Sequence, residues 1–197
     1  MLTGDKVKLR AIEREDQNVF WAYSNDLELE ILTSDQPPTP ISRAGMMAFF
    51  DKRIEESQPH HWFSIVADGQ LIGACGLSNF ETTARTCTLG IRIGDRAYWG
   101  RGYGRDAIST IIDYGFTHLN MHRIWLTVLP SNERAIRSYR ACGFREEALL
   151  RSHIWVDGGP QDEVIMGLLR SEWACSARPG SRLGSPMDPS EENDAVA

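Results

Sequence analysis

The stretch YWGRGYGRDA, residues 98–107, places glycines at positions 100, 102 and 104, between a β-branched run and an apolar helical pattern. Glycine has no Cβ atom, so this backbone can approach a ligand closely and adopt positive φ angles. Successive N–H groups in such a turn form a concave site for anions, and the following helix adds the positive end of its dipole. Arg101 and Arg105 carry charge that suits a phosphate, although a tight helix-entry turn with solvated arginines fits the same pattern.

Other phosphate-binding motifs fit this turn poorly. A P-loop requires Gly-Lys-Ser or Gly-Lys-Thr, which the chain lacks. Gly102, Gly104 and Ala107 satisfy the GxGxxG/A fingerprint of dinucleotide-binding proteins, but the segment GDRAYW separates them from the preceding strand. The acidic residue expected about twenty positions further on is missing, because that region has the sequence WLTVLP. These departures disfavour a nicotinamide-dependent oxidoreductase.

Around the turn, the hydrophobic pattern alternates between the periods of strands and helices. Before it, KVKLRAI predicts a strand, residues 13–25 and 42–57 predict helices, and Asp68-Gly69 predicts a hairpin within a run of strands, WFSIVA, QLIGACGLS and RTCTLGIRI. After it, the pattern predicts a helix over 107–119, a strand over 123–129, a helix over 131–144 that stops at Gly143, and a closing hairpin of HIWV and EVIMGLL. The order β-α-α-β-β-β-α-β-α-β-β predicts a mixed sheet with helices on its faces.

Composition narrows the class of protein. The 197 residues have a formal net charge of −6, which disfavours nucleic-acid binding through phosphate contacts. No apolar run approaches the roughly 18 residues of a membrane span, and the N-terminus lacks the apolar centre of a signal peptide. The four cysteines form no CxxC motif, and His118 and His122 straddle an expected helix end, so we expect no metal site and a cytoplasmic location.

The composition changes at Ala174. From there to the end the sequence is rich in Ser, Pro, Gly and acids, with almost no large apolar residues. Such a segment cannot bury enough apolar surface to offset the entropy of ordering it. We therefore expect a single domain over residues 1–173 and a disordered tail over residues 174–197.

The segment from Leu89 to Phe144 resembles the GNAT superfamily of acetyl-coenzyme A-dependent N-acetyltransferases. Within it, WGRGYGRDA is similar to the pyrophosphate loop of that family, and NERAIRSYRACGF is similar to its second signature. The resemblance extends to LRAIEREDQ near the start and DEVIMGLLRSEW near the end, so it covers nearly all of residues 5–173. It is closest to the branch that includes Rim-type ribosomal-protein N-terminal acetyltransferases and spermidine acetyltransferases.

The resemblance implies a single mixed α/β domain with a mostly antiparallel sheet, a splayed central strand pair and helices on both faces. It implies acetyl-CoA as co-substrate and no metal. Ile91 and Ile93, on the splayed strand, would flank the pantetheine arm, and Asn132 would face the cofactor from the other side, a role compatible with capping its helix. The residues that would offer backbone N–H groups to the pyrophosphate are Gly100, Arg101, Gly102, Gly104 and Arg105.

The family reaction has an amine attack the thioester carbonyl, after which coenzyme A leaves as a thiolate. Tyr139 aligns with the tyrosine that the family uses as general acid, and a phenol, with an ordinary pKa of about 10, is protonated at neutral pH. The structural alternative for Tyr139 is core packing beside Ile136 and Phe144. A backbone N–H near Ile91 is the natural donor to the charge that develops on the carbonyl oxygen.

The general base is the weak point of this assignment. Many relatives carry a glutamate near the position of Thr88, and a threonine cannot act as a carboxylate base. The alternatives are Glu81, Asp162, Glu163, or His153 acting through water. A missing base favours an α-amine, with a pKa of about 8, over a lysine-type amine near about 10.4.

These features predict acetyl transfer from acetyl-CoA to a primary amine, which could be a protein N-terminus, a polyamine or a small-molecule amine. The alternative is a non-catalytic acyl-CoA sensor or interaction module, which the missing glutamate supports. Trp21, Tyr23 and the proline loop 37–40 are candidates for the wall of the acceptor pocket. Relatives are often dimers, so a homodimer is expected by analogy, with no nucleic-acid or membrane partner.

Overall fold

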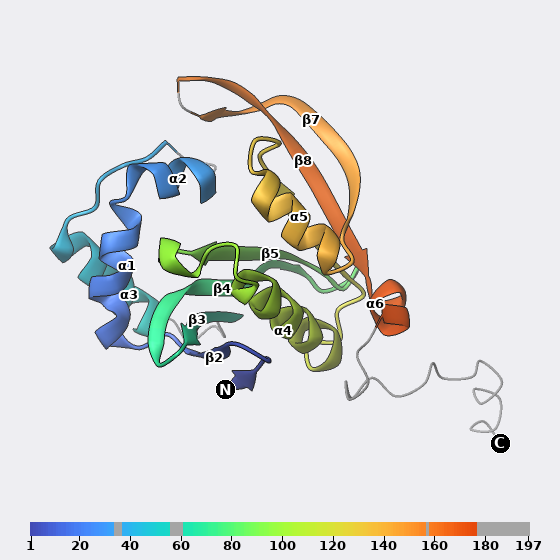
Figure 1. Ribbon diagram of the computed structural model, residues 1–197, viewed down its shortest axis with the longest axis horizontal. Coiled ribbons are helices and arrows are strands. Elements are labelled where there is room, and N and C mark those ends of the chain that lie inside the picture. Colours follow the sequence, from blue (N-terminus) through green and yellow to red (C-terminus); the bar gives the residue numbers. More distant parts are fainter. Residues whose placement is uncertain (34–36, 56–60, 157, 177–197) are drawn as a thin grey trace.

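A computed structural model of the chain describes residues 1–33, 37–55, 61–156 and 158–176. Its centre is a sheet of eight strands in the order β1-β2-β3-β4-β5-β6-β8-β7 (Figure 1). Neighbouring strands are antiparallel except for β5 and β6, which are parallel. The strands are β1 (Leu2–Thr3), β2 (Lys8–Ala11), β3 (His61–Ala67), β4 (Gln70–Glu81), β5 (Thr86–Ile93), β6 (Arg123–Val128), β7 (Arg145–Val156) and β8 (Gly159–Leu169).

Helices flank this sheet, and Figure 1 shows α1, α2 and α3 grouped together while α4 and α5 lie nearer its middle. The helices are α1 (Gln17–Ser24), α2 (Leu27–Thr33), α3 (Arg43–Glu55), α4 (Tyr103–Thr117), α5 (Glu133–Ala141) and α6 (Arg170–Ser176), with short 3-10 turns η1 (Arg14–Asp16) and η2 (Arg96–Tyr98). The predicted order of strands and helices is confirmed, and β1, α2 and α6 are additions to it. α6 continues past residue 173, and residues 177–197 of the expected tail lie outside the described residues.

α2 had no counterpart among the predicted elements. Its sequence LELEIL alternates acidic and apolar residues, the period of a strand rather than of a helix. The Asp26 side chain accepts the backbone N–H of Leu29 at 3.2 Å, which starts the helix, and the Leu29 side chain is fully buried. Capping and burial of one side chain therefore outweigh the local pattern.

The core lies between α4 and one face of the sheet. The apolar face of α4, including Ile108, Ile112 and Phe116, belongs to one buried cluster with Leu77 of β4 and Ile124 of β6. Because apolar area removed from water is the main stabilising term, this layer fixes α4 on the sheet.

The opposite face of the sheet carries the N-terminal helices. Ser64 of β3 donates its hydroxyl to the buried carboxylate of Asp16 at 2.7 Å, and the Tyr23 hydroxyl of α1 donates to the Leu71 carbonyl of β4 at 3.2 Å. Helices thus cover both faces, as predicted.

The turns that the sequence predicted are present. Asp68 and Gly69 have φ angles of 51° and 78°, as the hairpin between β3 and β4 requires. Gly143, with φ 95°, ends α5, and the Ser42 hydroxyl accepts the N–H of Gly45 at the start of α3. α4 ends at Thr117, so His118 and His122 do not share a helical face.

The sheet splits between its parallel strands. β5 and β6 pair only from Thr86–Thr88 to Arg123–Trp125, and beyond these residues each strand continues without the other. α4 follows β5 and α5 follows β6, so each side of the split leads into a helix. The expected splayed strand pair is confirmed, and it opens a wedge between the strands.

No helix in the described part of the chain is long and apolar enough to cross a membrane.

Candidate functional site

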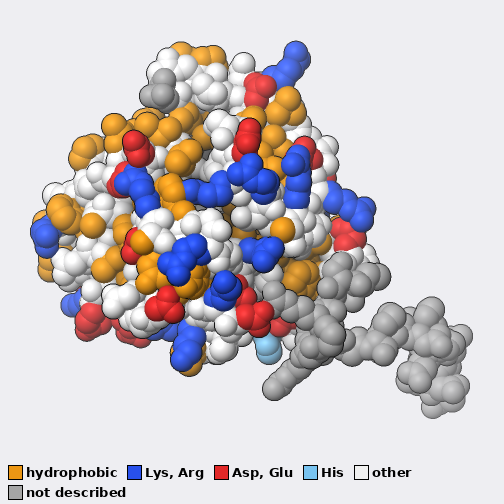
Figure 2. Space-filling view, in the orientation of Figure 1, with side chains coloured by type: hydrophobic (Ala, Val, Ile, Leu, Met, Phe, Trp, Pro, Cys, Tyr) orange, Lys and Arg blue, Asp and Glu red, His pale blue; other side chains and the backbone are white. Residues whose placement is uncertain are grey.

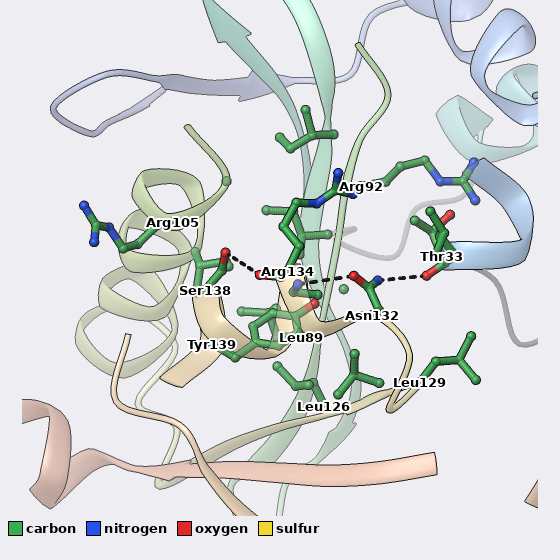
Figure 3. A pocket seen from close by; sticks show the side chains of 18 of the residues that line it. Thr33, Leu89, Arg92, Arg105, Leu126, Leu129, Asn132, Arg134, Ser138 and Tyr139 are labelled. Carbon is green, nitrogen blue, oxygen red and sulfur yellow. Dashed lines mark hydrogen bonds between the residues drawn. The ribbon is translucent and has the colours of Figure 1, made fainter. Parts of the chain in front are cut away.

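A cavity of about 1130 Å³ occupies the wedge between β5 and β6. Its walls come from α2, β5, the glycine turn, β6 and α5, with further residues from β7 and β8 (Figure 3). All of the predicted site residues line it, namely Ile91, Ile93, Gly100, Arg101, Gly102, Gly104, Arg105, Asn132 and Tyr139. The fold therefore brings together residues that lie almost fifty positions apart in the chain.

The glycine turn presents unused backbone donors to this cavity. Gly100 and Gly102 have φ angles of 71° and 87°, which L side chains rarely adopt. Gly102 is the N-cap of α4, so Gly104 and Arg105 lie in the first turn of that helix rather than in the loop before it. Across the described residues, the backbone N–H groups of residues 100–105 have no hydrogen-bond acceptor. A row of free N–H groups at a helix N-terminus is an anion-binding site.

The turn is held from behind by the N-terminal segment. The buried carboxylate of Asp106 accepts the backbone N–H groups of residues 5–7, at 3.1, 2.7 and 3.0 Å. The ammonium group of Lys6 donates to the Arg101 carbonyl at 3.0 Å. Asp106 thus uses its charge to hold the N-terminal segment against the start of α4.

Positive charge surrounds the cavity. Figure 2 shows Lys and Arg side chains gathered across the middle of the face in view. The basic residues that line the cavity are Lys6, Arg92, Arg101, Arg105, Arg134 and Arg137. Free N–H groups and several cations fit the diphosphate and phosphate of coenzyme A.

β5 contributes one unpaired edge to the wedge. The Ile91 and Ile93 side chains pack against the core cluster under α4, so their backbone lies at the open edge. The Ile93 carbonyl already accepts the indole N–H of Trp99 at 2.8 Å, which fixes the free end of the strand. An unpaired strand edge can hydrogen-bond an extended ligand as a further strand would.

Both the oxygen and the nitrogen of the Asn132 side-chain amide form hydrogen bonds within the fold. Its Oδ1 accepts the N–H of Ala135 at 3.2 Å, so it is the N-cap of α5. Its Nδ2 donates to the Leu32 carbonyl of α2 at 3.1 Å (Figure 3). The N-cap role is confirmed, and contact with a cofactor stays a prediction.

α2 spans the wedge near this point. Glu30 of α2 forms an ion pair with Arg92 of β5, with 2.6 Å between Oε1 and Nη1. The Leu32 carbonyl is bound by Asn132 at the start of α5. α2 is thus tied to both sides of the split, and the sequence carries no local signal for either contact because the partners lie about 60 and 100 residues away.

Tyr139 lies on α5 and is buried against the core. Its ring packs edge-on against Phe144, with 5.9 Å between the ring centroids. Burial raises the pKa of Tyr139 well above its ordinary value, so the phenol stays protonated. Its hydroxyl has no hydrogen-bond partner within the described residues, and Figure 3 shows it at the part of the cavity that Leu89 and Leu126 also line. The packing role is confirmed, and the acid role stays a prediction.

Thr88 is saturated with hydrogen bonds. Its hydroxyl donates to the Ser78 carbonyl at 3.1 Å, and it accepts from Asn79 Nδ2 at 3.0 Å. Because its one proton is used, the 3.0 Å contact with the Ser78 hydroxyl must be donated by Ser78. Thr88 is left with neither a proton nor a lone pair for a substrate.

Of the four candidate bases, two line the cavity and two do not. Glu81 and Asp162 do not line it. The Glu81 carboxylate accepts the backbone N–H of Thr83 in a turn, and the Asp162 carboxylate accepts the N–H of Ser152 at an irregularity within β7. His153 and Glu163 do line it. The distance from His153 Nε2 to Glu163 Oε2 is 3.7 Å, and the Glu163 side chain is buried.

Trp21 and Tyr23 were candidates for the wall of an acceptor pocket, with core packing as the alternative for Trp21. Neither lines the cavity. The Trp21 indole donates to the Ile41 carbonyl and stacks under Arg43, and the Tyr23 ring packs against Gly94. Residues 37–40 also lie outside the lining, whereas α2 contributes Leu29, Leu32 and Thr33 to it, and the position of the acceptor stays a prediction.

Known proteins share this arrangement. The family model described as the acetyltransferase (GNAT) domain matches residues 6–145. The chain is 31% identical over 175 residues to the uncharacterized N-acetyltransferase p20 of Bacillus licheniformis, across 88% of this chain and 98% of that protein. It is 28% identical over 187 residues to the spermidine N(1)-acetyltransferase of Escherichia coli K12, across 94% and 98% of the two chains.

A solved structure has the same fold as this protein. The spermidine N-acetyltransferase from Vibrio cholerae, in complex with CoA and spermine, matches with a TM-score of 0.77 and 28% identity, covering 85% of this chain and 98% of that one. The split sheet, the uncovered glycine turn and the family match over most of the chain lead to one conclusion: this protein belongs to the GNAT family of N-acetyltransferases.

Proposed function

We propose that this protein transfers the acetyl group of acetyl-CoA to a primary amine that carries a single positive charge. The observation that carries the proposal is one cavity that holds the free N–H groups of the glycine turn, the unpaired edge of β5 and the hydroxyl of Tyr139. Acetyl-CoA supplies an activated acyl group, because the thiolate of coenzyme A is a good leaving group. The residues of this chain bind, orient and exchange protons.

The glycine turn would hold the diphosphate. Backbone N–H groups of Gly100 to Arg105 have no other acceptor within the described residues, and the dipole of α4 favours negative charge there. The unpaired edge of β5 would then receive the pantetheine arm and direct the thioester into the wedge. An N–H of that edge near Ile91 would donate to the carbonyl oxygen of the thioester.

Tyr139 would donate the proton that the departing sulfur requires. The hydroxyl has no competing partner within the described residues, and burial raises its pKa, so the proton is present throughout the neutral range. A positioned acid of this kind contributes about 10² to 10⁴ in rate.

We propose the pair of Glu163 and His153 as the route for the amine proton. These are the candidates that line the cavity, while Thr88 has no free lone pair. His153 is half-exposed and Glu163 is buried beneath it, so the imidazole can pass a proton between the cavity and solvent. The carboxylate would stabilise the imidazolium during that transfer.

The charges of the cavity favour a monoamine over a polyamine. The basic residues of the lining are assigned to the phosphates of coenzyme A, and the described lining offers the amine one carboxylate, Glu163. The other nearby carboxylate, Glu30, is already paired with Arg92. Because some relatives are named spermidine acetyltransferases, a polyamine is the main competing acceptor. A polycation, however, needs more carboxylates than this lining offers. An α-amine also places less demand on the base, because its pKa is about 8.

A thiol-release assay with acetyl-CoA and a panel of amines tests the proposal. The panel contains short peptides with a free N-terminus, small monoamines, spermidine and spermine. We expect the highest kcat/KM for a monoamine, at least tenfold above spermidine. A preference for spermidine would overturn the acceptor assignment, and release no faster than hydrolysis with every amine would favour an acyl-CoA sensor.

Assembly and cellular location stay predictions. A homodimer is expected by analogy with relatives, and light scattering of the purified protein checks it. Fractionation of the producing cell checks the expected cytoplasmic location.

A further inference from the structure

Arg134 and Trp99 join the two sides of the split sheet. Arg134 lies in the first turn of α5, and its guanidinium carbon is 3.5 Å from the centre of the Trp99 ring. This is the geometry of a close cation–π stack. Trp99 directly precedes the glycine turn, and its indole N–H is held by the Ile93 carbonyl at 2.8 Å. The ring is therefore fixed, and the guanidinium rests on it at the edge of the cavity that both residues line.

The guanidinium of Arg134 has no carboxylate partner within the described residues. Two other arginines of the cavity are paired, Arg92 with Glu30 and Arg137 with Glu133. Arg101 and Arg105, on the glycine-turn side, have no ion pair within the described residues, as is the case for Arg134 on the α5 side. A guanidinium has five N–H donors, and stacking on a ring uses none of them. Arg134 is also half-buried, and this desolvation lowers its pKa without neutralising it at physiological pH. A half-buried cation with free donors that lines a ligand cavity is suited to bind an anion.

We propose that Arg134 binds the diphosphate of acetyl-CoA from the α5 side, opposite the N–H groups of the glycine turn. Trp99 is then a positioning residue, because stacking on its ring fixes the guanidinium of Arg134 before the ligand binds. The planar donors of arginine match two phosphate oxygens at once. The assignment rests on the proposed function only in taking acetyl-CoA as the ligand.

The kinetic consequence depends on where the contact lies. The diphosphate is remote from the reacting carbonyl, so Arg134 holds the ground state and the transition state equally. Loss of the side chain should raise KM for acetyl-CoA and leave kcat nearly unchanged.

The test compares Arg134→Gln with Arg140→Gln by calorimetric titration with coenzyme A and by steady-state kinetics. Both variants remove one charge from α5, but Arg140 is exposed, is paired with Glu146 and does not line the cavity. We expect Arg134→Gln to weaken coenzyme A binding by about 10- to 100-fold, and Arg140→Gln to change it less than about twofold. Arg134→Lys, which keeps the charge without the planar donors, should fall between them.

A donor without phosphate separates binding from structural damage. S-acetylpantetheine has the thioester but no diphosphate, so wild type and Arg134→Gln should use it with equal kcat/KM. Trp99→Leu should weaken coenzyme A binding in the same direction as Arg134→Gln, by a smaller factor. Thermal melting of each variant reports its folding.

The outcomes are distinct. Unchanged coenzyme A affinity in Arg134→Gln would overturn the proposal, and so would an equal loss toward S-acetylpantetheine, since a structural role would reduce both. If wild type binds coenzyme A but acetylates no amine, the proposed function fails, and the titrations alone still decide the role of Arg134.

Discussion

The two sides of the split sheet offer a ligand different kinds of group. On the β5 side, the backbone contributes the N–H donors of the glycine turn and the open edge of the strand, beside the Arg92, Arg101 and Arg105 side chains. On the β6 side, the groups are side chains, with Tyr139 and Arg134 on α5 and Glu163 on β8. A backbone site depends on φ angles and on missing Cβ atoms, whereas a side-chain site depends on what packs beside it. Substitutions should therefore act differently on the two sides.

The largest effect is expected on the side-chain side, at Tyr139. Tyr139→Phe keeps the ring against Phe144 and removes only the proton donor. We expect kcat to fall about 10²- to 10⁴-fold, with little change in KM for acetyl-CoA. Tyr114→Phe is the matched control, because that hydroxyl contacts His61 at 3.0 Å outside the cavity. Full activity of Tyr139→Phe with the preferred amine would show that another group is the acid.

The pH dependence of the wild type is governed by the same residue. The acid must be protonated to act, and burial raises the pKa of Tyr139 above its ordinary value of about 10. The rate should therefore show no alkaline decline below about pH 10, and it should rise with pH as more of the amine becomes neutral. A fall in kcat between pH 8 and 9, in a protein still folded by circular dichroism, would contradict the assignment.

The next effect is expected at Glu163. Glu163→Gln removes the buried carboxylate and keeps its shape, so kcat at pH 7 should drop about tenfold or more. The loss should shrink near pH 10, where a free amine needs no base. Asp162→Asn is the control, since Asp162 lies outside the cavity and binds the Ser152 N–H. A deficit that is constant across pH would mean that Glu163 supports the strand and not the proton transfer.

A smaller effect is expected on the backbone side, and it should appear in affinity. Gly102→Ala places a Cβ at φ 87°, which strains the turn that presents the N–H groups. Gly69→Ala imposes a similar strain at φ 78° in a hairpin outside the cavity. Both should lose about 1–2 kcal/mol of stability, but only Gly102→Ala should bind coenzyme A several-fold more weakly. If Gly102→Ala and Gly69→Ala bind coenzyme A with equal affinity, the glycine turn does not bind the diphosphate.

The smallest effect is expected at Asn132, whose side chain links α5 to α2. Asn132→Ala loses the N-cap and should cost about 1 kcal/mol in urea unfolding. Asn132→Asp keeps a capping oxygen but not the donor to the Leu32 carbonyl, so it should lose less. If both variants keep full stability and bind coenzyme A equally weakly, the Asn132 side chain contacts the cofactor. The β6 side of the split would then resemble the β5 side in binding the cofactor.

The residues that line the cavity from the glycine turn and β5 could be predicted closely from the sequence, and the contribution of α2 could not. The positive φ angles of Gly100 and Gly102 are a local property, and the glycines at positions 100, 102 and 104 predict them. α2 was missed, since its strand-like pattern is overridden by the Asp26 cap and by burial of Leu29. The sequence could not place Trp21, because an indole packs equally well in a core or in a pocket wall.

The sequence by itself determined the order of strands and helices, the glycine turn and the position of Tyr139 in its signature, because each depends on residues within one or two turns of the chain. Only the tertiary structure decided which base candidate faces the cavity, that Thr88 is saturated, and that Arg134 is left without a carboxylate among the described residues. These depend on partners brought from distant parts of the chain, such as Glu30 with Arg92 and Asn132 with Leu32. No local pattern records such pairings, since they arise when the sheet splits and the helices pack across the gap.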